Sequence, residues 1–129
     1  MALVLDTGPI FAALDVRDAH HAACRRLILE TAESLVIPAP VLPEVDYWLS
    51  KRVHAHAFSS LLHDIRRGAF RVEALVDGDY ARVQRMVEDY ADLGIGFVDA
   101  SGVSIAERLG GPSSRRWIGG TSAWSAHAT

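Results

Sequence analysis

Apolar residues follow two alternating patterns along the chain, short continuous runs and longer stretches with helical spacing. The short runs predict strands, and the longer stretches, in which charged residues fill the opposite face, predict amphipathic helices. The predicted strands are ALVLD, SLVIP, FRVEAL and IGFVDA. The predicted helices cover residues 10–14, 19–32, 41–52, 53–67, 79–90 and 101–110. Strands that alternate with helices in this order indicate an α/β fold with a central parallel sheet flanked by helices.

Composition narrows the class of protein. A chain of 129 residues, 50% hydrophobic and 22% charged, suits one soluble domain with one core. The start MALVLDTG lacks a leader pattern, and no stretch approaches the roughly 20 apolar residues of a membrane span, so we expect a cytoplasmic protein. The single cysteine, Cys24, excludes an internal disulfide and a cysteine zinc cage. The net charge of -3 argues against a surface coated with positive charge.

Three acidic residues fall where the predicted strands give way to helices. Asp6 and Asp99 end the runs LVLD and GFVD, and Glu44 follows the second strand early in a helix. Because ligands collect at the carboxyl ends of parallel strands, we expect these three side chains to share one crevice. An aspartate after a strand is also a routine helix N-cap, worth about 1 kcal/mol, so one such residue alone is weak evidence for a site.

Carboxylates placed together repel one another, so such a grouping normally holds a cation. Oxygen ligands without cysteine or a suitably spaced histidine pair favour Mg²⁺ or Mn²⁺ over Zn²⁺. A metal of this kind lowers the pKa of a bound water and neutralises a phosphodiester in the transition state. The candidate metal-binding and catalytic residues are therefore Asp6, Glu44 and Asp99.

These residues lie in motifs that resemble a known family. VLDTGPIFAAL, IPAPVLPEVDYWL and YADLGIGFVDASGVSIAERLG resemble the first three acidic motifs of PIN domains, in particular the VapC toxins of toxin and antitoxin pairs. The resemblance covers residues 1–111 and implies a PIN-like three-layer fold. It also implies cleavage of RNA by a Mg²⁺- or Mn²⁺-dependent endoribonuclease, inhibition by a small VapB-type antitoxin, and a homodimer. By position, Asp6 and Asp99 would bind the metal directly, Glu44 would complete the site, and Thr7 would support it by hydrogen bonding or serve the turn.

The segment 112–129 departs from the family, which usually has a fourth acid in a stretch resembling ATLDRRHF. No acid follows Glu107, and the segment is rich in Gly, Ser and Ala, so we expect an atypical tail without the regular last strand. Trp is encoded only by TGG and every Ile codon starts with AT. Read two bases later, the Trp117–Ile118 junction therefore encodes Asp. We hypothesise that a frameshift near Pro112 replaced the last strand and the fourth acid, which would weaken the site.

Two competing functions follow from these observations. The first is a phosphatase of the haloacid dehalogenase kind, which needs a second acid two residues after the first. This chain has Gly8 at that position, so the sequence argues against this function. The stronger alternative is a catalytically impaired PIN domain that only binds its antitoxin, because the fourth acid is missing.

Several other residues allow more than one interpretation. The histidines His54, His56 and His63 lack the spacing of a zinc pair and are interpreted as surface or partner-facing residues. Trp48 fits either the core or a surface for a partner. The Lys51–Arg52 pair fits a solvated helix face or a phosphate contact.

Overall fold

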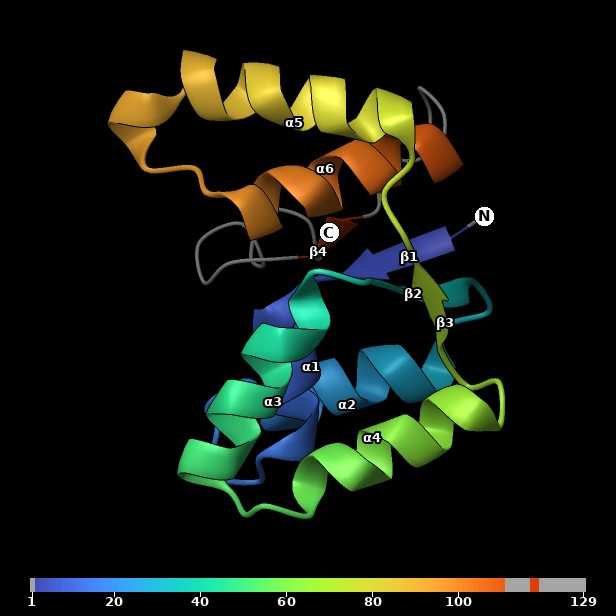
Figure 1. Ribbon diagram of the computed structural model, residues 1–129. Coiled ribbons are helices and arrows are strands. Elements are labelled where there is room, and N and C mark those ends of the chain that lie inside the picture. The colour runs from blue at the N-terminus through green and yellow to red at the C-terminus, as the bar shows by residue number, and fades with distance from the viewer. Residues whose placement is uncertain (1, 111–116, 119–129) are drawn as a thin grey trace.

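The computed structural model describes residues 2–110 and 117–118, and Figure 1 shows their arrangement in layers. The elements in chain order are β1 (Ala2–Leu5), α1 (Thr7–Leu14), α2 (His21–Glu30), β2 (Ser34–Pro38), α3 (Val41–Arg52), α4 (Ala57–Arg66), β3 (Arg71–Glu73), α5 (Asp77–Asp89), the 3₁₀ turn η1 (Ala91–Leu93), α6 (Phe97–Gly110) and β4 (Trp117–Ile118). None of the helices in the described part of the chain is long and apolar enough to cross a membrane.

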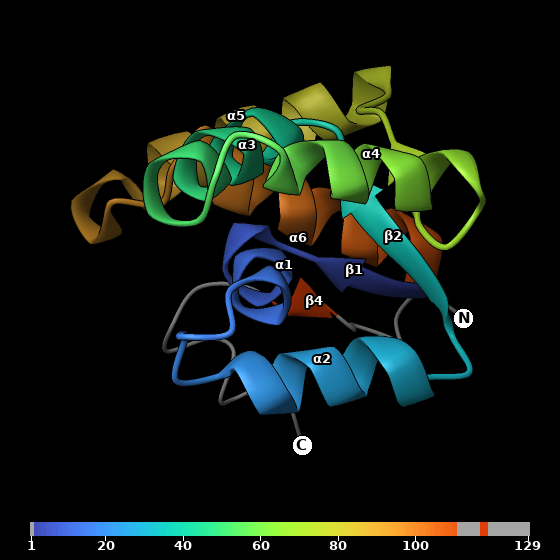
Figure 2. The ribbon, with the colours of Figure 1, turned by 90° about the horizontal axis from the view of Figure 1, so that it is seen from below.

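The strands form one parallel sheet in the order β3-β2-β1-β4. Helices α1 to α4 cover one face of the sheet, and α5 and α6 cover the other (Figures 1 and 2). This arrangement confirms the predicted α/β fold with a central parallel sheet flanked by helices. Its consequence for function is that β1 and β2, paired through Val4 and Val36, both end at the same edge of the sheet.

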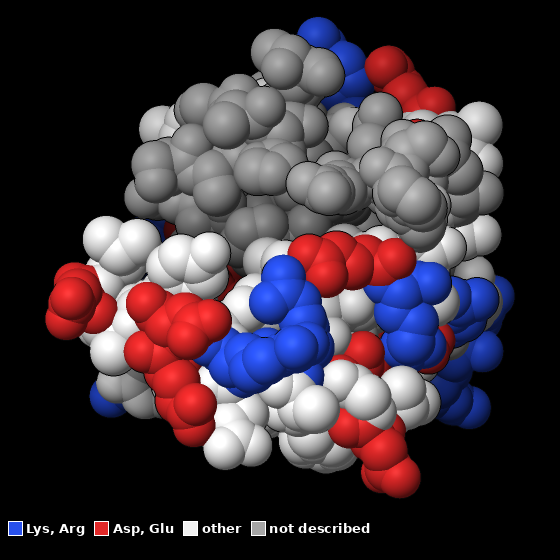
Figure 3. All heavy atoms as spheres, turned by 90° about the horizontal axis from the view of Figure 1, so that it is seen from above, with Lys and Arg blue, Asp and Glu red and all other residues white. Residues whose placement is uncertain are grey.

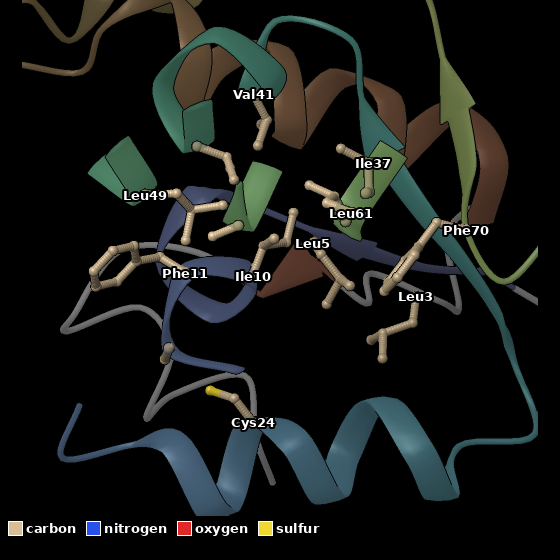
Figure 4. Close-up of a cluster of buried hydrophobic side chains, with 13 residues drawn as sticks. Leu3, Leu5, Ile10, Phe11, Cys24, Ile37, Val41, Leu49, Leu61 and Phe70 are labelled. Carbon is tan, nitrogen blue, oxygen red and sulfur yellow. The ribbon is translucent and has the colours of Figure 1, made fainter. Parts of the chain in front are cut away.

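Strand β1 explains how one short sequence supports two packed layers. Alternate side chains of a strand point to opposite faces, so Leu3 and Leu5 enter the core under α1 to α4, whereas Ala2 and Val4 meet α6. All four are buried, which accounts for an uninterrupted apolar run in place of an alternating one. Figure 4 shows the larger core, which is formed by Leu3, Leu5, Ile10, Phe11, Ala12, Cys24, Ile37, Val41, Val45, Leu49, Ala57, Leu61 and Phe70.

Most of the predicted elements are present, with shifts at their ends. The helix predicted over residues 53–67 begins only at Ala57, and it stops before Gly68, whose φ of 88° lies in the left-handed region that glycine tolerates. The segment Thr7–Pro9, expected as a turn, forms the first turn of α1, where Pro9 fits because its missing N–H would have had no helical partner.

One prediction about a strand is wrong. The run IGFVDA is not a strand, because α6 begins at Phe97 and therefore includes Asp99 in its first turn. Of the tail, which was expected to lack a regular last strand, the described residues Trp117 and Ile118 pair in parallel with Val4 and Leu5 of β1. A two-residue ladder satisfies backbone groups on the outer edge of β1, which would otherwise remain unpaired. The other positions of the tail prediction lie outside the described residues.

A buried polar group, which we call the Asp79 cluster, joins α5, α6 and β3. It consists of Asp79, Ser104, Arg108 and Glu73. Asp79 is 3% exposed. Its side chain accepts hydrogen bonds from the Val76 backbone N–H and the Ser104 hydroxyl, and forms a 3.0 Å ion pair with Arg108. These donors outweigh burial and lower the pKa of Asp79. The cluster therefore holds α6, the helix that carries Asp99, against the rest of the fold.

We expect Asp79→Ala to reduce the free energy of unfolding by about 2–3 kcal/mol, because it leaves Arg108 and Ser104 without a partner they use in the folded protein. The control is Glu107→Gln, which breaks the half-exposed ion pair with Arg82 and should cost less than about 1 kcal/mol. Urea unfolding followed by circular dichroism measures both values, and equal losses would contradict a special role for the Asp79 cluster.

Candidate functional site

Asp6 lies at the centre of the candidate site. It follows β1 directly and occupies the N-cap position of α1, but its side chain makes no capping hydrogen bond. The residue is only 4% exposed, and its Oδ1 atom is buried without a hydrogen-bond partner among the described residues. A buried carboxylate oxygen without a partner is costly, so simple helix capping does not account for Asp6.

The pKa of Asp6 is raised from 3.8 to about 7. Burial is the largest cause, because it disfavours the charged form. The Asp99 carboxyl raises the pKa further through a side-chain hydrogen bond and through its charge, and the charge of Glu44 adds to this effect. The Thr7 backbone N–H opposes the rise by bonding to the carboxylate. The fold therefore brings the carboxyls of Asp6 and Asp99 together and places Glu44 near enough to act on Asp6 through its charge.

The three acids reach this place from the starts of three helices. Asp6 precedes α1, while Glu44 and Asp99 lie in the first turns of α3 and α6. The partial positive charge at a helix N-terminus favours nearby carboxylates and partly offsets their mutual repulsion. Glu44 is half-buried and Asp99 is exposed, so the group opens to solvent on the Asp99 side.

The donor set fits a hard divalent cation that keeps part of its water shell. Within the described residues, no group of three or more Asp, Glu, His or Cys side chains is placed so that it could hold a metal ion. Asp6, Glu44 and Asp99 therefore do not form a three-ligand site by themselves, but Mg²⁺ is usually held by only one or two carboxylates together with waters and substrate oxygens. The buried, unpartnered Oδ1 of Asp6 beside a second carboxyl supplies this kind of donor set.

The hydroxyl oxygen of Thr7 is buried and has no hydrogen-bond partner among the described residues, so the expected supporting bond is not present. His54, His56 and His63 are all exposed, and only His63 lies within a helix, because α4 starts at Ala57. This outcome fits their interpretation as surface residues.

A pocket of about 370 Å³ adjoins the carboxylates and lies between α1, α2 and α3. Asp6 and Glu44 line one part of it, and Trp48 and Arg52 line another. Its remaining lining residues are Thr7, Gly8, Pro9, Phe11, Ala12, Asp18, His20 and Cys24. The predicted burial of Cys24 is confirmed at 1% exposed, and burial raises the pKa of its thiol to about 11, which makes it a packing residue and not a nucleophile.

The pocket residues Trp48 and Arg52 were not grouped with the acids by sequence reasoning. The signal was present in the spacing, because Glu44, Trp48 and Arg52 are four residues apart and so share one face of a helix. It was missed because the apolar pattern alone does not tell which helix face borders the carboxylates. Trp48 is 39% exposed, so it does not belong to the closed core.

Comparison with known proteins identifies the class. The model of the PIN domain family matches residues 3–113, so the chain belongs to the PIN-domain family. Within that family it is of the VapC type: it is 30% identical over 106 residues to Ribonuclease VapC26 of Mycobacterium tuberculosis (strain ATCC 25618 / H37Rv), a match that covers 82% of this chain and 78% of the relative.

A solved structure supports the fold independently. The crystal structure of Mycobacterium tuberculosis VapC20, described as a sarcin-ricin loop cleaving toxin, superposes with a TM-score of 0.74. The match covers 84% of this chain and 83% of that chain at 21% identity. The layered fold is thus retained although few residues are shared.

The raised pKa of Asp6 predicts how stability depends on pH in the absence of metal. Between about pH 4 and pH 7 the folded protein retains a proton on Asp6 that the unfolded chain releases, so stability falls as pH rises through this window and levels off above it. Asp6→Asn removes the titrating group. We therefore expect the variant not to show the fall in the free energy of unfolding, up to about 4 kcal/mol, that the natural sequence shows as pH rises.

Urea unfolding in EDTA at pH 5 and pH 8 measures this effect as the difference between the variant and the natural sequence. Asp92→Asn, in the exposed turn η1, is the control and should follow the natural sequence at both pH values. The same pH dependence in Asp6→Asn and in the natural sequence would contradict a buried, raised Asp6.

Proposed function

We propose that this protein is a Mg²⁺- or Mn²⁺-dependent endoribonuclease and the toxin of a toxin-antitoxin pair. The observation that carries the proposal is the buried Asp6 carboxyl, which lies beside Asp99 and within the field of Glu44. Membership of the PIN family and the similarity to a protein named as a ribonuclease support RNA as the substrate.

Each acid has a distinct part in this proposal. Asp6 and Asp99 would hold the cation directly, because their carboxyls lie together, and Glu44 would complete the site from α3. The bound cation would polarise the phosphodiester and supply a water of lowered pKa. Burial of Asp6 excludes competing solvent from one side of the group, and the exposed Asp99 leaves the other side open to an RNA strand.

The proposed protein partners follow from the similarity of the chain to VapC-type PIN domains. We propose that a VapB-type antitoxin inhibits the toxin by covering this open side, and that the protein acts as a homodimer in the cytoplasm. The membrane has no part in this scheme.

A second function rests on a specific observation, the absence of any acid after Glu107 in the sequence. With fewer carboxylates the site attracts a second cation less strongly, so the protein could retain antitoxin binding while cleaving RNA poorly. Cleavage of RNA with and without Mn²⁺ separates the two functions: metal-stimulated cleavage supports the enzyme, and its absence in a folded, antitoxin-binding protein supports the impaired domain. DNA sequencing across the codons after Gly111 tests the frameshift hypothesis.

We expect Glu44→Gln to lower metal-dependent RNA cleavage by about 100-fold or more, because the substitution keeps the shape of the side chain and removes its charge. Asp46→Asn, which removes an exposed charge from the same helix, is the matched control and should leave the rate within about twofold. An unchanged rate in Glu44→Gln would exclude Glu44 from the site.

Binding of Mn²⁺ should compete with the proton on Asp6. We expect the apparent Mn²⁺ affinity to increase from pH 6 to pH 8, since the cation requires the ionised carboxylate. Isothermal titration in two buffers of different ionisation enthalpy measures the released proton. Asp6→Asn should abolish both the proton release and most of the affinity, and unchanged binding in that variant would place the metal elsewhere.

A further inference from the structure

Helix α3 carries three different chemical groups along one face. Glu44 lies in its first turn, Trp48 one turn later, and Arg52 at its last residue. Residues four apart on a helix are about 6 Å apart along the axis and lie on the same side. All three line the pocket that also contains Asp6, so the pocket extends from the carboxylates to an aromatic and a cationic side chain.

Trp48 and Arg52 form a preassembled stacking surface. The Arg52 guanidinium carbon lies over the Trp48 ring, 5.1 Å from its centroid, and the Tyr47 ring contacts Trp48 edge-on with centroids 5.1 Å apart. These cation–π and edge-to-face contacts restrict the indole before any ligand arrives. Arg17 donates a hydrogen bond to the backbone carbonyl of Arg52, which ties the end of α3 to the loop after α1.

The rest of the pocket favours a flat, neutral group. Phe11, Ala12 and Cys24 give it buried apolar walls, and a volume of about 370 Å³ is within the range of small-ligand pockets. Asp18 adds negative charge to that of Glu44, which disfavours an anion lodged inside the pocket. A nucleobase is flat and neutral, and unstacked bases bind to aromatic rings and guanidinium planes.

The face of the molecule on the α5 side, opposite the pocket, has mixed charge. On the α5 side of the molecule, acidic and basic side chains of the described residues lie next to one another (Figure 3). This face therefore offers no uniform positive surface among the described residues.

We propose that this pocket holds one nucleobase of a single-stranded RNA substrate, the base next to the cleaved phosphodiester, stacked on the Trp48–Arg52 surface. The proposal rests on the proposed ribonuclease function and adds to it a residue pair that selects and positions the substrate. Stacking at this point would place the adjoining phosphate at Asp6, Glu44 and Asp99.

The test is a double-mutant cycle that combines a substitution in the protein with removal of a base from the RNA. A set of RNA oligonucleotides, each with one base removed near the cleaved bond, is cleaved by the natural protein and by Trp48→Ala. In the natural protein, removal of the base that occupies the pocket should lower kcat/KM by about 5- to 100-fold, the range of one base stacked on an aromatic side chain. In Trp48→Ala the intact RNA should be cleaved correspondingly more slowly, and removal of that same base should have almost no further effect.

Two further variants separate stacking from folding. Trp48→Phe keeps an aromatic ring and should retain most of the sensitivity to base removal, while Tyr80→Ala removes an exposed aromatic residue from α5, on the opposite side of the sheet, and should behave as the natural protein. Circular dichroism establishes that each variant is folded. Stacking is measured directly with an RNA that carries 2-aminopurine in place of the base whose removal lowers kcat/KM, bound in EDTA so that it is not cleaved. The fluorescence of this RNA should be quenched by the natural protein and not by Trp48→Ala.

The outcomes distinguish this proposal from the function on which it rests. If the natural protein cleaves RNA and every base removal affects it and Trp48→Ala equally, the pocket proposal is overturned and the ribonuclease stands. If no RNA is cleaved but quenching depends on Trp48, the base site is supported and the catalytic function is not. If Trp48→Ala loses only its antitoxin, with unchanged RNA cleavage and quenching, the pocket belongs to a protein partner and the proposal is wrong.

Discussion

The structure depends on the burial of one carboxyl group among others of like charge. Asp6 is almost completely covered, has an oxygen without a partner, and lies beside Asp99, so in the metal-free protein its pKa rises to about 7. A fold selected for stability alone would not keep such a group, because an apolar or hydrogen-bonded residue would serve better at the end of β1. A cation bound beside Asp6 would offset this cost, which is why we propose a metal site there.

The surrounding fold supplies what this carboxyl needs. The apolar run of β1 fixes Asp6 at the edge of the sheet, and β2 delivers α3 with Glu44 to the same edge. Asp99 comes from α6, which packs on the other face and is secured at its far end by the Asp79 cluster. The acids are thus brought together by apolar packing and by an ion pair elsewhere in the molecule, and these contacts offset the cost of placing like charges near one another.

The sequence predicted the layers and the parallel sheet, because apolar periodicity is a local signal. It also predicted that Asp6 and Asp99 lie near each other, although Asp99 reaches Asp6 from the first turn of α6 and not from the end of a strand. It did not predict that GFVD belongs to a helix, since a short apolar run suits either a buried strand or the buried face of a helix. The Asp79 cluster was also missed, because Asp79 reads as an ordinary helix-start acid until Ser104 and Arg108 are brought to it by folding. The pairing of β4 with β1 escaped prediction because it depends on an available sheet edge more than on the propensity of Trp117 and Ile118.

The order of the site residues along the chain has a consequence during synthesis. Asp6 and Glu44 leave the ribosome early, but Asp99 and the helix that positions it come from the end of the described domain. Domains fold as units once their contacts can form, so a nascent chain that ends before α6 lacks one of the paired carboxyls and the cover on one face of β1. Prematurely terminated products would therefore lack Asp99 as well as stability, and the three acids can come together only after almost the whole domain has been made.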